Sequence, residues 1–212
     1  MNGVCARCTP GLGSSVRNHL RVRDESGHCH GTDPLFPPPS EDAGVLSLNV
    51  PVPGEARRLA GELRPWLAAF DSIRDRHTLV AKRLDNTAEG GRARVEGRAR
   101  RALAGAPAFE ARVTGIDFFA EPTAGTAPVV YFAVESPGLD RIHDRLVEVF
   151  GALDGVEGAE YTPHVTLARG GAMEMAERLA DRTIDPVTWT VSELEFYDAR
   201  YRERIGTVSL PG

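Results

Sequence analysis

Two histidines stand in short apolar segments whose composition suits strands and whose side chains suit proton transfer. They are His77, within residues 76–80 (Arg-His-Thr-Leu-Val), and His164, within residues 163–167 (Pro-His-Val-Thr-Leu). Because residues i and i+2 share a face of a strand, His164 and Thr166 should project together. An imidazole moves protons near neutral pH, and a hydroxyl donates a hydrogen bond to a phosphate oxygen. Two such histidines on opposite walls could act as base and acid on a phosphodiester without a metal.

The histidine segments lie within an alternation of predicted strands and helices. Apolar and alternating segments predict strands over 45–52, 77–84, 109–119, 129–134, 162–169, 187–197 and 204–210. Apolar residues at helical spacing predict helices after Pro53-Gly54 with a break at Pro65, after a capping box of Asn86 and Glu89, after the N-cap Ser136, and over 172–180.

The two halves of this pattern repeat. Residues 47–54 (SLNVPVPG) are similar to residues 131–138 (YFAVESPG), and each segment leads into an amphipathic helix and then a histidine strand. The repeat predicts an α+β domain over 45–212, with two lobes of about 45–120 and 129–212 related by a pseudo-twofold axis. Each lobe would then contribute one histidine strand to a shared groove.

The segment Pro163-His164-Val165-Thr166-Leu167-Ala168-Arg169 resembles the second motif of the two-histidine (2H) phosphoesterases, specifically the 2'-5' RNA ligase-like (LigT) branch. The resemblance covers Val45 to the C-terminus. It implies a bilobal fold with two antiparallel sheets lining a central groove, and chemistry on 2',3'-cyclic phosphates or 2'-5' linkages. It also implies that His77 and His164 are the proton-transfer pair and that Thr166 binds phosphate, with no metal and no cofactor.

The first motif departs from the family pattern. The family has Thr or Ser two residues after the histidine, and here that position is Leu79. Either a bulge turns Thr78 toward the phosphate, or the first lobe contributes His77 without a hydroxyl partner. Strict alternation places Arg83 on the face of His77, where its charge could replace the missing hydrogen bond.

Three further side chains near the motifs have open roles. Arg169 occupies a position that is often basic in such motifs, although strict alternation points it away from His164. Tyr161 could stack on a base or pack at an edge of the sheet. His143 lies beside charged neighbours on a predicted helix, and we expect it at the surface.

Residues 1–44 differ from the rest of the chain in composition. They are rich in Gly, Pro, Ser and Asp and have no apolar periodicity, which predicts a disordered leader or a gene start placed upstream of Val45. Cys5 and Cys8, followed by a His-Cys-His cluster at 28–30, leave zinc binding as an alternative for this segment.

Bulk composition limits the classes of function. The formal net charge is −5, so we expect contacts with nucleic acid to be local and specific for its ends. No apolar run approaches the length of a membrane span. The N-terminal residues lack the apolar segment of a signal peptide, so we do not expect export. Together with the resemblance, which implies a cyclic phosphodiesterase or 2'-5' RNA ligase, these features lead us to expect a cytoplasmic monomer that acts on RNA ends or a small cyclic nucleotide. The alternative is a non-catalytic RNA-end-binding module of the same fold.

Overall fold

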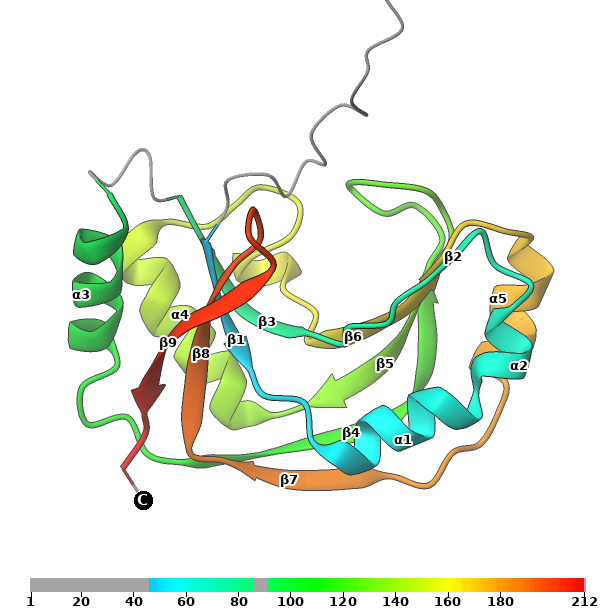
Figure 1. Ribbon diagram of the computed structural model, residues 1–212, viewed down its shortest axis with the longest axis horizontal. Coiled ribbons are helices and arrows are strands. Elements are labelled where there is room, and N and C mark those ends of the chain that lie inside the picture. Colours follow the sequence, from blue (N-terminus) through cyan, green and yellow to red (C-terminus); the bar gives the residue numbers. More distant parts are fainter. Residues whose placement is uncertain (1–45, 86–90, 212) are drawn as a thin grey trace, which may run out of the picture. The chain divides into compact units, whose positions relative to one another are not determined.

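The computed structural model describes residues 46–85 and 91–211, as a single antiparallel sheet with helices packed against it (Figure 1). The strands are β1 (Leu46–Val50), β2 (Ser72–Ile73), β3 (Leu79–Leu84), β4 (Phe109–Phe119), β5 (Val129–Glu135), β6 (His164–Arg169), β7 (Val187–Val191), β8 (Glu193–Asp198) and β9 (Glu203–Ser209). The helices are α1 (Gly54–Glu62), α2 (Arg64–Leu67), α3 (Arg92–Ala102), α4 (Pro137–Phe150), α5 (Met173–Ala180) and the 3₁₀ helix η1 (Gly158–Glu160). The predicted leader (1–44) and the predicted capping box (86–89) lie outside the described residues.

Two groups of four strands make up most of the sheet. The strand order is β7-β4-β5-β6-β3-β1-β8-β9, and β2 pairs with β6. The groups β7-β4-β5-β6 and β3-β1-β8-β9 meet at β3 and β6, through the pair Leu79–Val165. The predicted α+β fold with antiparallel strands is confirmed, and the two central strands are β6, which begins at His164, and β3, which follows His77 in the chain. The strand groups do not follow the predicted lobes, because β4 joins the second group of repeat strands and β8 joins the first.

Local signals fixed several element boundaries. The Ser136 hydroxyl accepts a 3.1 Å hydrogen bond from the backbone N–H of Leu139, which confirms the predicted N-cap of α4. The predicted helix break is also confirmed, since α1 ends at Glu62 and α2 carries Pro65 in its first turn. The predicted strand 187–197 is instead two strands, β7 and β8, which separate at Ser192 and pair in different groups.

The helices cover one face of the sheet and bury its apolar side chains. Helix α4 packs on β3, β4 and α3, while α5 packs on β4 and β5 (Figure 1). One continuous core results, and it includes Leu48, Leu79, Phe132, Val165 and Leu167. None of the described helices is long and apolar enough to cross a bilayer.

The opposite face of the sheet carries polar side chains. Cross-strand partners share a face, and the pairs Asp117–Tyr131 and Tyr131–Thr166 lie beside the core pairs of the same strands. Thr166 and His164 therefore lie on the face that turns away from the core. We call this side of the sheet the polar face and the helix-covered side the core face.

Candidate active site

His164 begins β6 on the polar face and is held by an aromatic wall and one backbone carbonyl. Its ring lies 5.1 Å from the ring of Phe119, edge to face, and 5.2 Å from that of Tyr131. Nδ1 is 2.7 Å from the carbonyl oxygen of Thr162. A carbonyl only accepts, so Nδ1 carries the proton and donates this hydrogen bond. The neutral imidazole then holds its lone pair on Nε2, which is the atom that can accept a proton.

The surroundings of His164 favour this neutral form. Burial lowers the pKa of His164, and the nearby positive charges of Arg83 and Arg169 lower it further. The hydrogen bond to the Thr162 carbonyl acts in the opposite direction and raises the pKa. Burial is the largest of these effects, and the net shift is downward. At neutral pH the ring is therefore a base that stands among cationic side chains.

A β-bulge places Arg83 on the polar face. The pairing between β1 and β3 skips Ala81, so the alternation of β3 changes phase there. Arg83 then pairs with Ser47, and its positive charge acts on His164. The prediction that Arg83 shares a face with His77 is wrong, because strict alternation does not hold across this bulge.

A second bulge brings Arg169 to the same face. The pairing between β5 and β6 skips Leu167, so Arg169 follows Thr166 on the polar face instead of opposing it. Its Nη1 donates a 3.0 Å hydrogen bond to the carbonyl oxygen of Ala124 in the β4–β5 loop. The prediction that Arg169 points away from His164 is therefore wrong, and the physical reason is the inserted residue.

His77 lies in a different environment from His164. The predicted strand start at residue 77 is wrong, because β3 begins at Leu79. On the β2–β3 side, residues 74–78 lie between the pairs Ile73–Ala168 and Leu79–Val165, where β6 has only residues 166–167. The surplus residues form a bulged segment, and His77 lines a cavity with side chains of α1 and α2. No hydrogen bond or ring contact joins His77 to His164 in the part of the chain that the structure describes.

The electrostatic neighbours of His77 confirm this separation. Burial lowers the pKa of His77, and the charge of Arg57 lowers it further. Asp75 raises the pKa and Arg64 lowers it, by smaller amounts. None of these residues acts on His164, so the structure places the two predicted proton carriers in separate surroundings.

Comparison with known proteins identifies the family. The family model for the 2'-5' RNA ligase superfamily matches residues 77–202. The chain belongs to this superfamily. The match begins at the first histidine and includes β6, so the predicted resemblance to LigT-like 2H phosphoesterases is confirmed. Comparison with curated protein sequences gives no match.

Several solved structures share the fold. TT0787 of Thermus thermophilus is 22% identical with a TM-score of 0.56, and the alignment covers 79% of this chain and 98% of that one. Escherichia coli LigT in complex with 3'-AMP is 20% identical with a TM-score of 0.55, covering 79% and 98%. The same LigT in complex with NADP+ is 20% identical with a TM-score of 0.53, covering 80% and 99%.

The structure changes how the first superfamily motif corresponds to the second. Thr78-Leu79 matches Thr166-Leu167 when residues are compared by face, because Leu79 and Leu167 are both buried in the core. Alternation from Leu79 then places Thr78 on the polar face. The residue two positions before Thr78 is Arg76, which stands where His164 stands in the second motif.

Arg76 is a polar-face residue that sequence reasoning missed. Its guanidinium lies 5.3 Å from the centre of the Tyr197 ring, and Nη1 donates a 2.7 Å hydrogen bond to the carbonyl oxygen of Arg202. Tyr197 pairs with Ser47 on the polar face. Aligning His77 with His164 leaves Arg76 outside the first motif, because that alignment assumes that the two histidines lie on the same face of the sheet.

Tyr131 and Asp117 complete the wall beside His164. The Tyr131 hydroxyl is hydrogen-bonded to the Asp117 carboxylate, and burial with this negative charge raises the pKa of Tyr131 to about 12. The ring of Tyr131 also lies 4.3 Å from that of Phe119. Tyr131 therefore stays neutral and supports the imidazole as an aromatic wall. No sequence motif marks Asp117, Phe119 or Tyr131. Their grouping beside His164 is visible only from the register of the strands.

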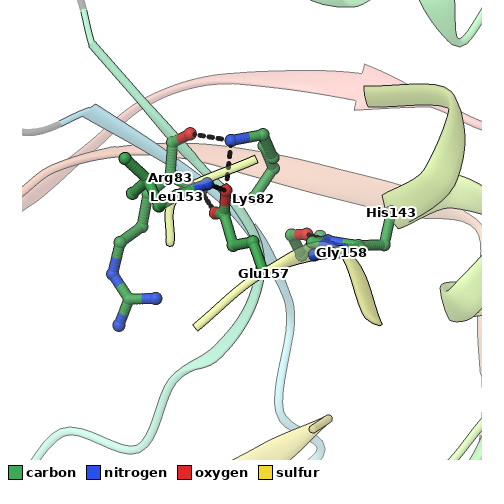
Figure 2. A network of polar contacts seen from close by, with 7 residues as sticks. Lys82, Arg83, His143, Leu153, Glu157 and Gly158 are labelled. Carbon is green, nitrogen blue, oxygen red and sulfur yellow. Dashed lines mark hydrogen bonds and ion pairs between the residues drawn. The ribbon is translucent and has the colours of Figure 1, made fainter. Parts of the chain in front are cut away.

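A buried polar network fixes the chain on either side of Arg83 (Figure 2). Lys82 Nζ and Glu157 Oε2 form a 2.5 Å ion pair, and each side chain is 2% exposed. The Glu157 carboxylate also accepts hydrogen bonds from the backbone N–H groups of Arg83, at 2.9 Å, and Leu153, at 3.0 Å. The loop before η1 is thereby tied to β3, which holds Arg83 in place.

His143 and Tyr161 extend this contact between the loop and β3. The two rings stack with centres 3.7 Å apart, and the Tyr161 hydroxyl donates a 2.8 Å hydrogen bond to the Val80 carbonyl oxygen. His143 Nε2 accepts a hydrogen bond from the N–H of Gly158 (Figure 2). Its Nδ1 donates to the Ala81 carbonyl oxygen. The predicted surface position of His143 is wrong, since its side chain is 1% exposed. For Tyr161 the structure favours packing over base stacking.

Proposed function

We propose that this chain is a metal-independent phosphoesterase that acts on a 2',3'-cyclic or 2'-5' phosphodiester, with His164 as its proton carrier. The observation that carries the proposal is the orientation of His164. Its Nδ1 is committed to the Thr162 carbonyl, and its Nε2 lone pair remains for chemistry. Membership of the 2'-5' RNA ligase superfamily supports the same class of reaction.

The residues around His164 suit a phosphate group. Thr166 shares its face and could donate a hydrogen bond to a phosphate oxygen. Arg83 and Arg169 supply positive charge that would stabilise the charge developing on the phosphoryl oxygens. A binding role for these three residues is part of the proposal.

The proposed reaction is an in-line displacement at phosphorus. In hydrolysis, the oxygen of a water molecule bonds to phosphorus while the bond to one ribose oxygen breaks. Nε2 of His164 takes the proton of the attacking water, and the departing ribose oxygen takes a proton on the opposite side. With a ribose 5'-hydroxyl in place of water and the 3'-oxygen as the leaving group, the same steps form a 2'-5' linkage, so hydrolysis and ligation differ only in the attacking oxygen.

Two forms of the proposal differ in the source of the second proton. In the two-histidine form, His77 protonates the departing oxygen. In the one-histidine form, solvent supplies that proton and Arg76 contributes positive charge. The position of His77 among residues of α1 and α2 supports the one-histidine form.

A second candidate function is an RNA-end-binding module without turnover. The observation that favours it is Arg76, which gives the first motif a group that binds phosphate but does not transfer protons. In either case the proposed setting is a cytoplasmic monomer, and the proposed ligand is an RNA end or a small cyclic nucleotide. The nucleotides bound to E. coli LigT include 3'-AMP, NADP+ and ATP, which supports a nucleotide ligand here.

The deciding experiment is a turnover assay with a chelator present. Purified full-length protein is incubated with a 2',3'-cyclic mononucleotide and with an oligonucleotide ending in the same group, and products are separated by chromatography. We expect ring opening that persists in EDTA and is lost in His164→Ala. Binding without any product would support the module, and activity that requires added metal would overturn the proton-transfer mechanism.

A further inference from the structure

A cavity of about 180 Å³ lies beside His77, between α1, α2 and the segment that joins β2 to β3. It is lined by Arg57, Ala60, Gly61, Arg64, Leu67, Ile73, Arg74, Asp75 and His77. The volume is well above the roughly 10–15 Å³ that a single water needs. None of the residues around His164 lines this cavity, so it is a separate place on the molecule.

The lining of the cavity has an excess of positive charge. Arg57, Arg64 and Arg74 supply three guanidinium groups, and Asp75 is the single carboxylate among the lining residues. Asp75 already forms an ion pair with Arg64: one carboxylate oxygen of Asp75 lies 3.1 Å from Arg64 Nη1, and the Asp75 side chain is 82% exposed. Such an exposed pair is weak, so it opposes anion binding only slightly.

Arg57 and Arg74 are each held by one hydrogen bond to the backbone of a neighbouring segment, and both keep guanidinium N–H groups that can bind a ligand. Arg57 Nη1 donates a 2.6 Å hydrogen bond to the Val52 carbonyl oxygen, which leaves its other N–H groups. The backbone N–H of Arg74 donates a 2.8 Å hydrogen bond to the Leu167 carbonyl oxygen, which fixes the start of the bulged segment. Within the described residues, the Arg74 side chain makes no hydrogen bond or ion pair.

We propose that this cavity is a second anion site, which binds a phosphate dianion through Arg57, Arg64, Arg74 and the imidazole of His77. The planar guanidinium group matches the oxygens of a phosphate in pairs. Inorganic phosphate and the terminal phosphate of a nucleotide present the same chemistry, and the test separates them. The site does not depend on the proposed turnover at His164.

His77 gives the proposed site its own reporter. Burial and Arg57 lower the pKa of His77, Asp75 raises it and Arg64 lowers it; the net shift is downward, so the neutral ring is favoured at neutral pH. A bound dianion would offset the arginine charges and favour the imidazolium. Phosphate binding should therefore be accompanied by proton uptake at His77, which would shift its ring resonances.

The test is an NMR titration of the histidine ring resonances of full-length protein, with His77 assigned by its loss in His77→Ala. Inorganic phosphate is one arm and 5'-AMP, a phosphate monoester, is the other. We expect the His77 resonances to shift and saturate with phosphate. A stronger response to 5'-AMP would mark a nucleotide as the ligand, and a response to phosphate alone would mark the free ion.

Variants locate the bound anion. Arg57→Gln and Arg74→Gln should each weaken phosphate binding at His77 by about tenfold or more, since each removes a charged hydrogen-bond donor. The matched control is Arg145→Gln on α4, which should leave the titration unchanged, as should His164→Ala. No shift at His77 with phosphate, equal weakening by Arg145→Gln, or loss of the shift in His164→Ala would each overturn the second site. The NMR titration does not measure turnover, so phosphate binding at His77 can be established even if the proposed enzymatic function fails.

Discussion

Leu79 pairs with Val165 across β3 and β6, and both side chains are buried in the core. This pair joins the two strand groups, and it also sets the phase of every neighbouring side chain. His164 and Thr166, on either side of Val165, must face away from the core. By the same rule Thr78 faces that side, whereas His77 falls in the bulged segment and packs near α1.

The first prediction concerns the two histidines. His164→Ala should lower the rate of cyclic phosphate opening by about 10²–10⁴-fold, because it removes the proton acceptor. His77→Ala should stay within a few-fold of the unmodified protein, since His77 lies in the separate cavity. Single-turnover rates in EDTA measure both. Equal losses in the two variants would establish the two-histidine form of the mechanism instead.

The second prediction concerns the pH dependence of the rate. His164 must be neutral to accept a proton, so the rate should rise with pH through a midpoint below the ordinary histidine pKa of about 6.5. Arg83 disfavours the imidazolium, so Arg83→Gln should raise the pKa of His164 and move this midpoint upward. Arg145→Gln, remote from His164, serves as the control. A midpoint that does not move in Arg83→Gln would exclude electrostatic coupling between these two residues.

The third prediction concerns the hydroxyl beside His164. Thr166→Val keeps the shape of the side chain and removes the hydrogen bond proposed for the phosphate. Loss of a hydrogen bond to a charged group costs about 1.5–3 kcal/mol, so the rate should fall by roughly 10–150-fold. A thermal melt close to that of the unmodified protein is the check on folding. An unchanged rate in a folded variant would remove Thr166 from the proposed site.

The fourth prediction concerns Leu79, which the family pattern would replace by Thr or Ser. Leu79 is fully buried, so Leu79→Thr should not create a phosphate contact. It should lower the free energy of unfolding by about 1–3 kcal/mol, because a hydroxyl enters the core without a partner. Chemical denaturation measures this loss. Thr78→Val should leave stability nearly unchanged, and an increase in rate in Leu79→Thr would show that residue 79 reaches the polar face.

The fifth prediction concerns the buried ion pair of Lys82 and Glu157. Glu157→Gln leaves the Lys82 charge buried without its counter-ion, which should cost about 3–5 kcal/mol in free energy of unfolding. Glu195→Gln breaks the exposed pair with Arg204 and should cost at most about 1 kcal/mol. Urea denaturation of both variants gives the comparison. Similar small losses in the two would mean that Lys82 keeps access to water.

Some of these features follow from the sequence alone, because their causes are local. The Ser136 cap and the break at Pro65 depend on a few neighbouring residues, and the motif around His164 is contiguous. The phases of Arg83 and Arg169 depend on inserted residues at Ala81 and Leu167, which no alternation pattern reveals. Each bulge reverses the face of the residues that follow it.

Contacts between segments that are distant along the chain could not be predicted from the sequence either. His143 looked like a surface residue because its neighbours on the helix are charged, yet its ring stacks on Tyr161 and bonds to the backbone of β3. The cavity beside His77 likewise combines two helices with a bulged loop. A single sequence does not indicate such contacts until the register of the strands is known.

The interleaving of the strand groups has a consequence for how the two halves of the chain depend on each other. Strand β4 ends the first repeat but pairs with β5 and β7, and β8 belongs to the second repeat but pairs with β1 and β9. A polypeptide made of one repeat would leave its last strand without partners. It could complete its sheet only by trading that strand with a second copy, as domain-swapped dimers do. The two halves of the present chain are therefore joined as the partners of such a dimer would be, and each half completes the sheet of the other.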